Sequence, residues 1–282
     1  MPLPSEHALR AAQAWKLSSV PVQPRSQAGE HLGRGTGSSL EFQDRRVYSA
    51  GDDVRHLDWR AFARTGELTV KVYREELLPR LDVLLDTSAS MAVVDEKAQL
   101  ALDLAVLFAL AARRQGFSVR VIPVGDGPGH LETDVLQGLG IEFEAARPLV
   151  ESLGAARESL RAGTLRILIS DFLSPHDAGP LIRQLSARAG GVILFQILSA
   201  GDAHPEEGTA LRMEDAESGE VRDIVLDPQT VADYLARLGR LTEALEIESR
   251  RAGAYFLSLE AGGDFNDLCR NKLGRGGLLV PG

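Results

Sequence analysis

The chain has 282 residues and a mass of 30.4 kDa, and hydrophobic residues make up 44% of it and charged residues 25%. These proportions are those of a globular protein, long enough for one large domain or two small ones, and they exclude wholesale disorder. Asp and Glu number 40 against 31 Lys and Arg, a net charge of −9 that disfavours a dedicated nucleic-acid binder. The single cysteine, Cys269, excludes an internal disulfide and a cysteine zinc cluster, and it indicates a reducing compartment.

The sequence contains no long apolar segment. Its first residues lack the apolar core of a signal peptide, and its most apolar stretch, 104–112, is far shorter than the ~20 residues that a membrane span needs. We therefore expect a cytoplasmic protein without a membrane span.

Residues 1–33 are predicted to form a separate N-terminal leader. A short helix over 5–16 is expected, capped by Ser5, with Leu9 and Ala12 on one side. The run that follows, 18–39, is rich in Ser, Pro and Gly and has few residues to bury. We expect it to be mobile or loosely packed.

From residue 81 onward, short apolar runs alternate with helical patterns. The runs are typical of strands covered on both faces of a parallel sheet, and they lie at 81–86, 118–124, 165–170, 191–198 and 254–259. The predicted helices lie at 95–115, where Gly116 is the expected stop, and at 147–162, 176–189 and 228–251. This alternation predicts a doubly wound, mostly parallel α/β domain over 81–282, with an inserted β-hairpin at about 210–226 around a turn at 216–219.

Oxygen-bearing side chains follow two of the predicted strands. Asp86, Ser88 and Ser90 form a D-x-S-x-S turn after the first strand, and Asp171 follows the strand 165–170. Ligands of open α/β sheets bind at the carboxyl ends of the strands, and a cluster of oxygens there suits Mg²⁺ or Mn²⁺. The alternative is structural, because Asp and Ser after a strand also cap helices and satisfy loop amides.

The arrangement resembles the metal-ion-dependent adhesion site of von Willebrand factor A domains. The resemblance implies that Ser88 and Ser90 bind the metal directly, while Asp86 and Asp171 act mainly through water. A threonine from a third loop completes the family's set, and the metal accepts a carboxylate from a partner protein. The resemblance therefore implies a von Willebrand factor A type fold and a site for adhesion rather than hydrolysis.

The chain departs from that pattern in the third loop. Before the helix expected at 147, the loop contains no Thr or Ser and offers Glu142 or Glu144 as substitutes. Either glutamate would add negative charge and weaken the attraction of the metal for a partner carboxylate. Alternatively, the ion is weakly held or absent.

A second resemblance covers a longer part of the chain, from about residue 33 to residue 172. Residues 45–74 are similar to the signature of the domain of unknown function 58 family, whose activity is not established. The matching residues are Arg46, Tyr48, Gly51, Asp52, Asp53, Arg55, Asp58, Trp59, Ala63 and Arg64. The resemblance implies association with MoxR-type AAA+ ATPases.

The signature segment, taken as 34–80, has balanced charge: eight cations face eight acids between residues 41 and 80. One interpretation is an ion-paired lattice that packs on the sheet and ties the leader to it. The other is a recognition surface for a partner, since Arg and aromatic residues are enriched at binding hot spots. The candidate partner-binding residues are Arg46, Arg55, Trp59 and Arg64.

The function predicted from these features is a non-enzymatic interaction or adaptor protein. It would work with a MoxR-type AAA+ ATPase on an unknown client protein, with contact made through Mg²⁺ at the adhesion site. One alternative is a structural scaffold with a degenerate metal site. Another is a metal-dependent hydrolase or phosphotransferase with Asp86 as nucleophile or ligand, for which the sequence shows no general base nearby.

Overall fold

A computed structural model of the chain describes residues 2–18, 40–49, 52, 54–75, 79–125, 141–174, 176–208, 210–214 and 221–282. Residues 19–39 of the expected linker, the signature residues Gly51 and Asp53, and the hairpin turn at 216–219 lie outside these ranges. The chain divides into two compact units: residues 1–25 with 79–282, and residues 26–78.

A five-stranded parallel sheet forms the centre of the first unit. Its strands are β4 (Arg80–Asp86), β5 (Ser118–Val124), β6 (Leu165–Ser170), β7 (Gly191–Leu198) and β10 (Tyr255–Glu260). They lie in the order β10-β7-β6-β4-β5, with every neighbouring pair parallel. The predicted doubly wound α/β fold is therefore confirmed. The strand order reverses between β4 and β6, and in such sheets the reversal opens the crevice where ligands bind.

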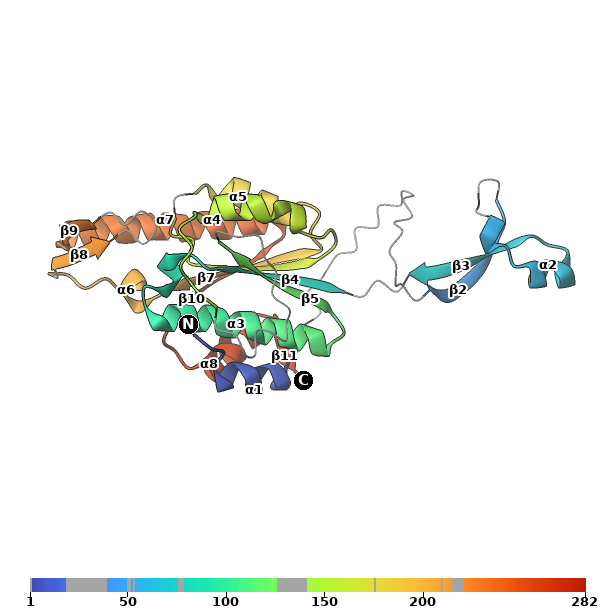
Figure 1. Ribbon diagram of the computed structural model, residues 1–282, viewed down its shortest axis with the longest axis horizontal. Helices are drawn as coiled ribbons and strands as arrows, with labels where there is room; N and C mark the ends of the chain where they lie inside the picture. Colours follow the sequence, from blue (N-terminus) through green and yellow to red (C-terminus); the bar gives the residue numbers. More distant parts are fainter. Residues whose placement is uncertain are drawn as a thin grey trace. The chain divides into compact units, whose positions relative to one another are not determined.

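Helices cover both faces of this sheet (Figure 1). On one face lie α1 (Glu6–Ala14) and α3 (Asp95–Arg114); on the other lie α4 (Leu149–Ala156), α5 (Ala178–Ser186) and α7 (Pro228–Ala252). Successive side chains of a strand point to opposite faces, so each strand contributes to both cores. On β4, Val83 and Leu85 pack in the core shared with α3, whereas Leu84 packs in the core shared with α5 and α7.

Shorter elements complete the first unit. They are η2 (Ala89–Ala92), η4 (Arg157–Ser159), α6 (Ala200–Ala203), α8 (Phe265–Asp267), η5 (Leu268–Gly274) and β11 (Leu279–Pro281). The inserted hairpin is present in the same unit as the antiparallel strands β8 (Ala210–Glu214) and β9 (Val221–Val225).

The helix α3 begins and ends close to where its sequence predicts. Asp95 is its first residue, and Gly116 follows its end with a φ of 83°, a left-handed conformation that glycine adopts without strain. Its middle is buried all round, from Ala101 to Ala109. The other predicted helices are present but shorter, except α7, which runs one residue past its expected end.

The N-terminal segment differs from the prediction of a separate leader. Ser5 caps α1 as expected, but Ala8, Ala11 and Ala12 are buried, and β1 (Trp15–Leu17) pairs antiparallel with β11. The side chain of Gln115 accepts a hydrogen bond from the Leu17 amide (2.9 Å) and donates one to the Leu17 carbonyl (3.0 Å). Residues 2–18 are thus part of the first unit, because small side chains on α1 allow close packing that local sequence does not reveal.

The second unit contains the signature segment. Its strands β2 (Leu40–Val47) and β3 (Thr69–Glu75) pair antiparallel, and η1 (Val54–His56) and α2 (Trp59–Thr65) lie between them in the chain. Its bounds, 26–78, are close to the 34–80 predicted for the segment. The packing of this segment on the sheet stays a prediction.

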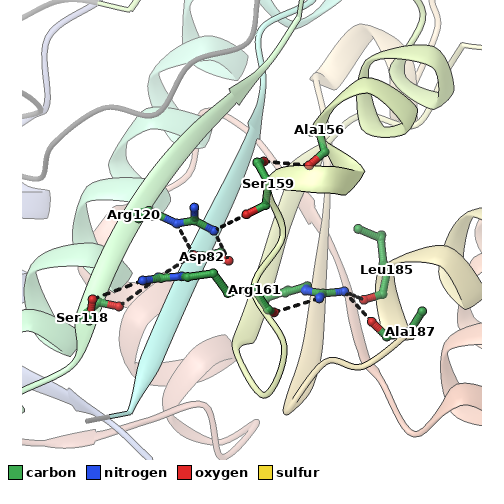
Figure 2. Close-up of polar contacts among 9 residues, drawn as sticks. Asp82, Ser118, Arg120, Ala156, Ser159, Arg161, Leu185 and Ala187 are labelled. Atoms are coloured by element: carbon green, nitrogen blue, oxygen red, sulfur yellow. Dashed lines mark hydrogen bonds and ion pairs between the residues drawn. The ribbon is translucent and has the colours of Figure 1, made fainter. Parts of the chain in front are cut away.

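A buried aspartate organises the amino end of the sheet (Figure 2). Asp82 on β4 is fully buried and accepts two hydrogen bonds from Arg120 (2.9 and 2.8 Å) and one from Arg161 (2.7 Å). Arg166, its register partner on β6, donates instead to the carbonyls of Arg161 and Ala187. Burial would raise the pKa of Asp82, but the hydrogen bonds from Arg120 and Arg161 outweigh it and hold that pKa below 3.8.

We expect Asp82→Asn to lower the free energy of unfolding by about 3 kcal/mol, because it leaves two partly buried guanidinium groups without their carboxylate. The folded-state pKa of Asp82 is depressed, so its contribution is present above pH 3.8 and is lost as the pH falls through the lower folded value. Urea unfolding at pH 7 and at pH 3 measures both effects. Asp233→Asn, at an exposed position of α7, is the control and should change stability by less than about 0.5 kcal/mol. Equal effects of the two substitutions on stability at pH 7 would contradict the stabilising role of Asp82.

Candidate functional site

The predicted oxygen cluster lies at the strand-order reversal. Asp86 ends β4, and Ser170 ends the neighbouring strand β6, directly before Asp171. The hydroxyl of Ser170 donates to Asp86 Oδ2 at 2.6 Å and joins the two strand ends. Asp86 and Asp171 are each only 2% exposed. The structure therefore brings the two predicted aspartates to one buried edge.

Asp86 has a partner for each carboxylate oxygen. The amide of Ser88 donates to Oδ1 at 2.9 Å, and Ser170 occupies Oδ2. Burial, followed by repulsion from Asp171, raises the pKa of Asp86 to about 6, although the hydrogen bonds from Ser170 and Ser88 act in the opposite direction. Ionisation of Asp86 at neutral pH therefore lowers the free energy of unfolding.

Asp171 is paired with a lysine that the sequence did not single out. Lys97, in the first turn of α3, places its Nζ 2.7 Å from Asp171 Oδ2 and 3.3 Å from Asp202 Oδ2. The Lys97 side chain is 3% exposed and that of Asp171 2%. The other Asp171 oxygen accepts the Leu173 amide at 3.0 Å. Burial, and then the charges of Asp202 and Asp171, raise the pKa of Tyr234 on α7 to about 12.

The two serines and the third loop meet beside Asp86. The hydroxyls of Ser88 and Ser90 are hydrogen-bonded at 3.0 Å, and Ser88 forms a β-bridge with Ala145 of the third loop. The approach is close: a Cβ added to Gly125 would lie 2.5 Å from Thr87 Oγ1 and 2.8 Å from the Ala145 Cβ. Glycine at 125 thus allows the ends of β4 and β5 and the third loop to come together.

Glu142 and Glu144, the possible substitutes for the missing threonine, lie on the exposed side of the third loop. Both are exposed and line a pocket with Asp95 and Glu96 at the start of α3. Within the described part of the chain, neither forms a hydrogen bond or ion pair with Ser88, Ser90 or the aspartates. The third loop reaches the cluster through the backbone of Ala145 instead.

The fit of the cluster to a divalent cation is partial. Two oxygens bound side by side to Mg²⁺ at about 2.1 Å lie about 3.0 Å apart in an octahedron, which is the spacing of the two serine hydroxyls. The carboxylates do not fit, because Asp86 is satisfied by hydrogen bonds and Asp171 by the Lys97 ammonium. In the described ranges, no group of three or more Asp, Glu, His or Cys side chains is arranged to hold a metal. The arrangement as a whole therefore does not fit Mg²⁺ or Mn²⁺.

The candidate partner-binding residues lie apart from this cluster in the chain, in the second unit. Arg46 pairs with Asp52 at 2.5 Å, and Arg55 lies in η1. Trp59 is the first residue of α2 and Arg64 lies in its last turn. Trp59 contacts Phe62 edge to face, with ring centroids 6.4 Å apart.

Lys97, Asp202 and Ser170 belong to the site and were missed from the sequence. Two of them had a local signal. Lys97 lies one turn before the buried middle of α3, directly above Ala101, and a cation that is buried there needs a partner. Asp202 completes a capping box with Ser199 directly after β7, which places it at a strand end.

We expect Asp86→Asn to be more stable than the wild type at pH 7.5, by up to about 3 kcal/mol, from a pKa of about 6 against 3.8 in the unfolded chain. The folded-state pKa is raised, so protonation stabilises the fold and the advantage of the variant should vanish as the pH falls from 7 to 4. Urea unfolding across this range measures the difference. Asp95→Asn, at an exposed position, serves as the control. A variant less stable than the wild type at pH 7.5 would contradict the raised pKa.

Two solved structures resemble the chain. One is described as an aerotolerance-related membrane protein from Bacteroides fragilis, with 12% identity, a TM-score of 0.41 and coverage of 70% of this chain and 97% of the other. The second is the conserved hypothetical protein BatB from Bacteroides thetaiotaomicron, with 15% identity, a TM-score of 0.38 and coverage of 65% and 91%. The description of the first as a membrane protein contradicts the cytoplasmic location expected from the sequence. No helix in the described ranges is long and apolar enough to cross a membrane.

The chain also has relatives among mycobacterial proteins. Uncharacterized proteins of Mycobacterium bovis (Mb1516) and Mycobacterium tuberculosis (Rv1480) are each 28% identical to the chain over 255 residues, which covers 84% of this chain and 80% of theirs. The family model described as protein of unknown function DUF58 matches residues 44–243, which include the signature residues 45–74 and both strand-end aspartates. The chain therefore belongs to the DUF58 family.

Proposed function

We propose that the chain is a non-enzymatic interaction module that binds a MoxR-type AAA+ ATPase through its signature segment and positions a client protein for it. The observation that supports this most is the exposed aromatic pair on α2. Trp59 is 62% exposed and Phe62 40%, although both are large apolar side chains. Exposed aromatic residues beside arginine are typical of binding hot spots.

Other apolar side chains of the same unit are exposed as well. They are Val47 at the end of β2, Val54 in η1 and Leu68 just before β3. The amide of Tyr48 donates to the Leu68 carbonyl at 2.9 Å, so Val47 and Leu68 belong to adjacent chain segments. Contiguous exposed apolar surface marks interaction sites, and Val47 and Leu68 add apolar surface to this unit.

The aromatic pair is held on an ordered helix. Asp58, 2% exposed, accepts hydrogen bonds from the amides of Arg60 (3.1 Å) and Ala61 (3.0 Å) and caps α2. Gly66 ends the helix with a φ of 73°. A preorganised surface loses less conformational entropy on binding, which favours its use as a contact.

The geometry of Asp86 favours a non-enzymatic role over the hydrolase alternative. A nucleophilic carboxylate needs a free oxygen that faces substrate, whereas Asp86 is buried and both of its oxygens accept hydrogen bonds. We propose a MoxR-type ATPase as the partner because of the family resemblance. The resemblance implies that the ATPase supplies the work, while this chain recognises the client.

The test is binding of the purified chain to the MoxR-type ATPase of the same organism, measured by biolayer interferometry. We expect the double variant Trp59→Ala/Phe62→Ala to bind at least about tenfold more weakly, since a hot-spot aromatic contributes roughly 2 kcal/mol. Its melting temperature should stay unchanged, because both side chains are exposed. The control, Ser88→Ala/Ser90→Ala, should keep full affinity.

Three results would count against the proposal. Absence of binding by the wild type would remove the ATPase as partner. Full affinity in the aromatic double variant would remove the signature segment as the contact. A lower melting temperature in that variant would show that the aromatic pair packs within the chain.

A further inference from the structure

We infer that the ammonium of Lys97 takes the place of the divalent cation at the strand-end cluster, so that this site works without Mg²⁺ or Mn²⁺. The inference concerns the chain alone and does not rest on the proposed partner.

Lys97 is a buried cation between two carboxylates. It is 2% exposed, and its Nζ lies 2.7 Å from Asp171 and 3.3 Å from Asp202. A buried ammonium is costly unless it is paired, and these two carboxylates provide the pairing. The same contacts compensate the charges of Asp171 and Asp202, which is what a bound cation would otherwise do.

Lys97 and its two carboxylate partners come from three different segments at one edge of the sheet. Asp171 follows β6, and Asp202 lies in the short helix after β7. Lys97 lies at the start of α3, the helix that follows β4 and the D-x-S-x-S turn. One side chain therefore connects the start of α3 with the segments that follow β6 and β7 at the carboxyl edge of the sheet. Of its two partners, Asp171 is the one that an adhesion site would use to hold the metal.

Most of the carboxylate oxygens of the cluster already accept a hydrogen bond or face the ammonium. Asp171 Oδ1 accepts the Leu173 amide, and Asp202 Oδ2 accepts the Ser199 amide at 2.8 Å as well as facing Lys97. Both Asp86 oxygens are also occupied. A divalent cation would have to displace these donors and would be repelled by the ammonium.

The serine pair alone keeps the spacing of metal ligands. Ser88 Oγ and Ser90 Oγ lie 3.0 Å apart and share a hydrogen bond. Removal of the Lys97 charge would leave these hydroxyls near carboxylates without a cation. The structure therefore predicts that Lys97 excludes the metal, and that its neutralisation creates an affinity for one.

The first experiment titrates metal-stripped wild-type protein with Mn²⁺ by calorimetry and compares its melting temperature in EDTA and in millimolar Mg²⁺. We expect no saturable binding and no change in melting temperature. Saturable binding that disappears in Ser88→Ala/Ser90→Ala would overturn the inference. Binding that persists in this variant belongs to surface carboxylates and agrees with a metal-free cluster.

The second experiment uses Lys97→Met, which keeps an unbranched side chain out to Cε and removes the ammonium group. We expect a lower melting temperature in EDTA and a rise on addition of Mg²⁺ that the wild type does not show. The rise should be absent when Ser88→Ala and Ser90→Ala are added. A variant that responds to Mg²⁺ no more than the wild type would contradict exclusion by Lys97.

A control keeps the test decisive if Lys97→Met does not fold. Lys97→Met/Asp171→Asn removes both charges of the pair and should be more stable than the single variant. If the double variant is no more stable, the ion pair is not what holds the cluster together and the inference fails.

Discussion

Compensation of buried negative charge at the junction of β4 and β6 is the constraint on which the site depends. Asp86 and Asp171 lie at neighbouring strand ends and repel each other, and both are withdrawn from water. The chain stabilises them in two ways. Asp86 is held by a hydroxyl and an amide, while Asp171 is held by the ammonium of Lys97. Because these donors come from different elements, charge compensation also fixes the loops of this edge.

The opposite edge of the sheet meets the same constraint with different residues. Asp82, on the same strand as Asp86, is compensated by Arg120 and Arg161, which are partly exposed. Arginine can satisfy a carboxylate with two parallel hydrogen bonds and keep contact with water. At the carboxyl edge the cation is instead a fully buried lysine, whose single nitrogen faces two carboxylates.

The two units of the chain present different surfaces for function. At the sheet edge, the polar groups of the cluster are largely satisfied by one another. In the signature segment, an aromatic pair on a capped helix is exposed. On this contrast rests our proposal that the signature segment, rather than a metal bridge at the sheet, makes the contact with a partner.

The fold class and the edge of the sheet where the cluster lies follow from local sequence patterns. Apolar runs bounded by turns predicted all five strands of the parallel sheet, and Gly116 predicted the end of α3, because these signals are local. Asp86 and Asp171 could be placed together since the carboxyl ends of parallel strands share one edge. Tertiary packing, in contrast, brings Lys97 against Asp171, which is 74 residues away in the chain. It also brings α1 onto α3 and places Glu142 and Glu144 at another pocket. Such contacts depend on how helices and loops pack across the sheet, which no local pattern specifies.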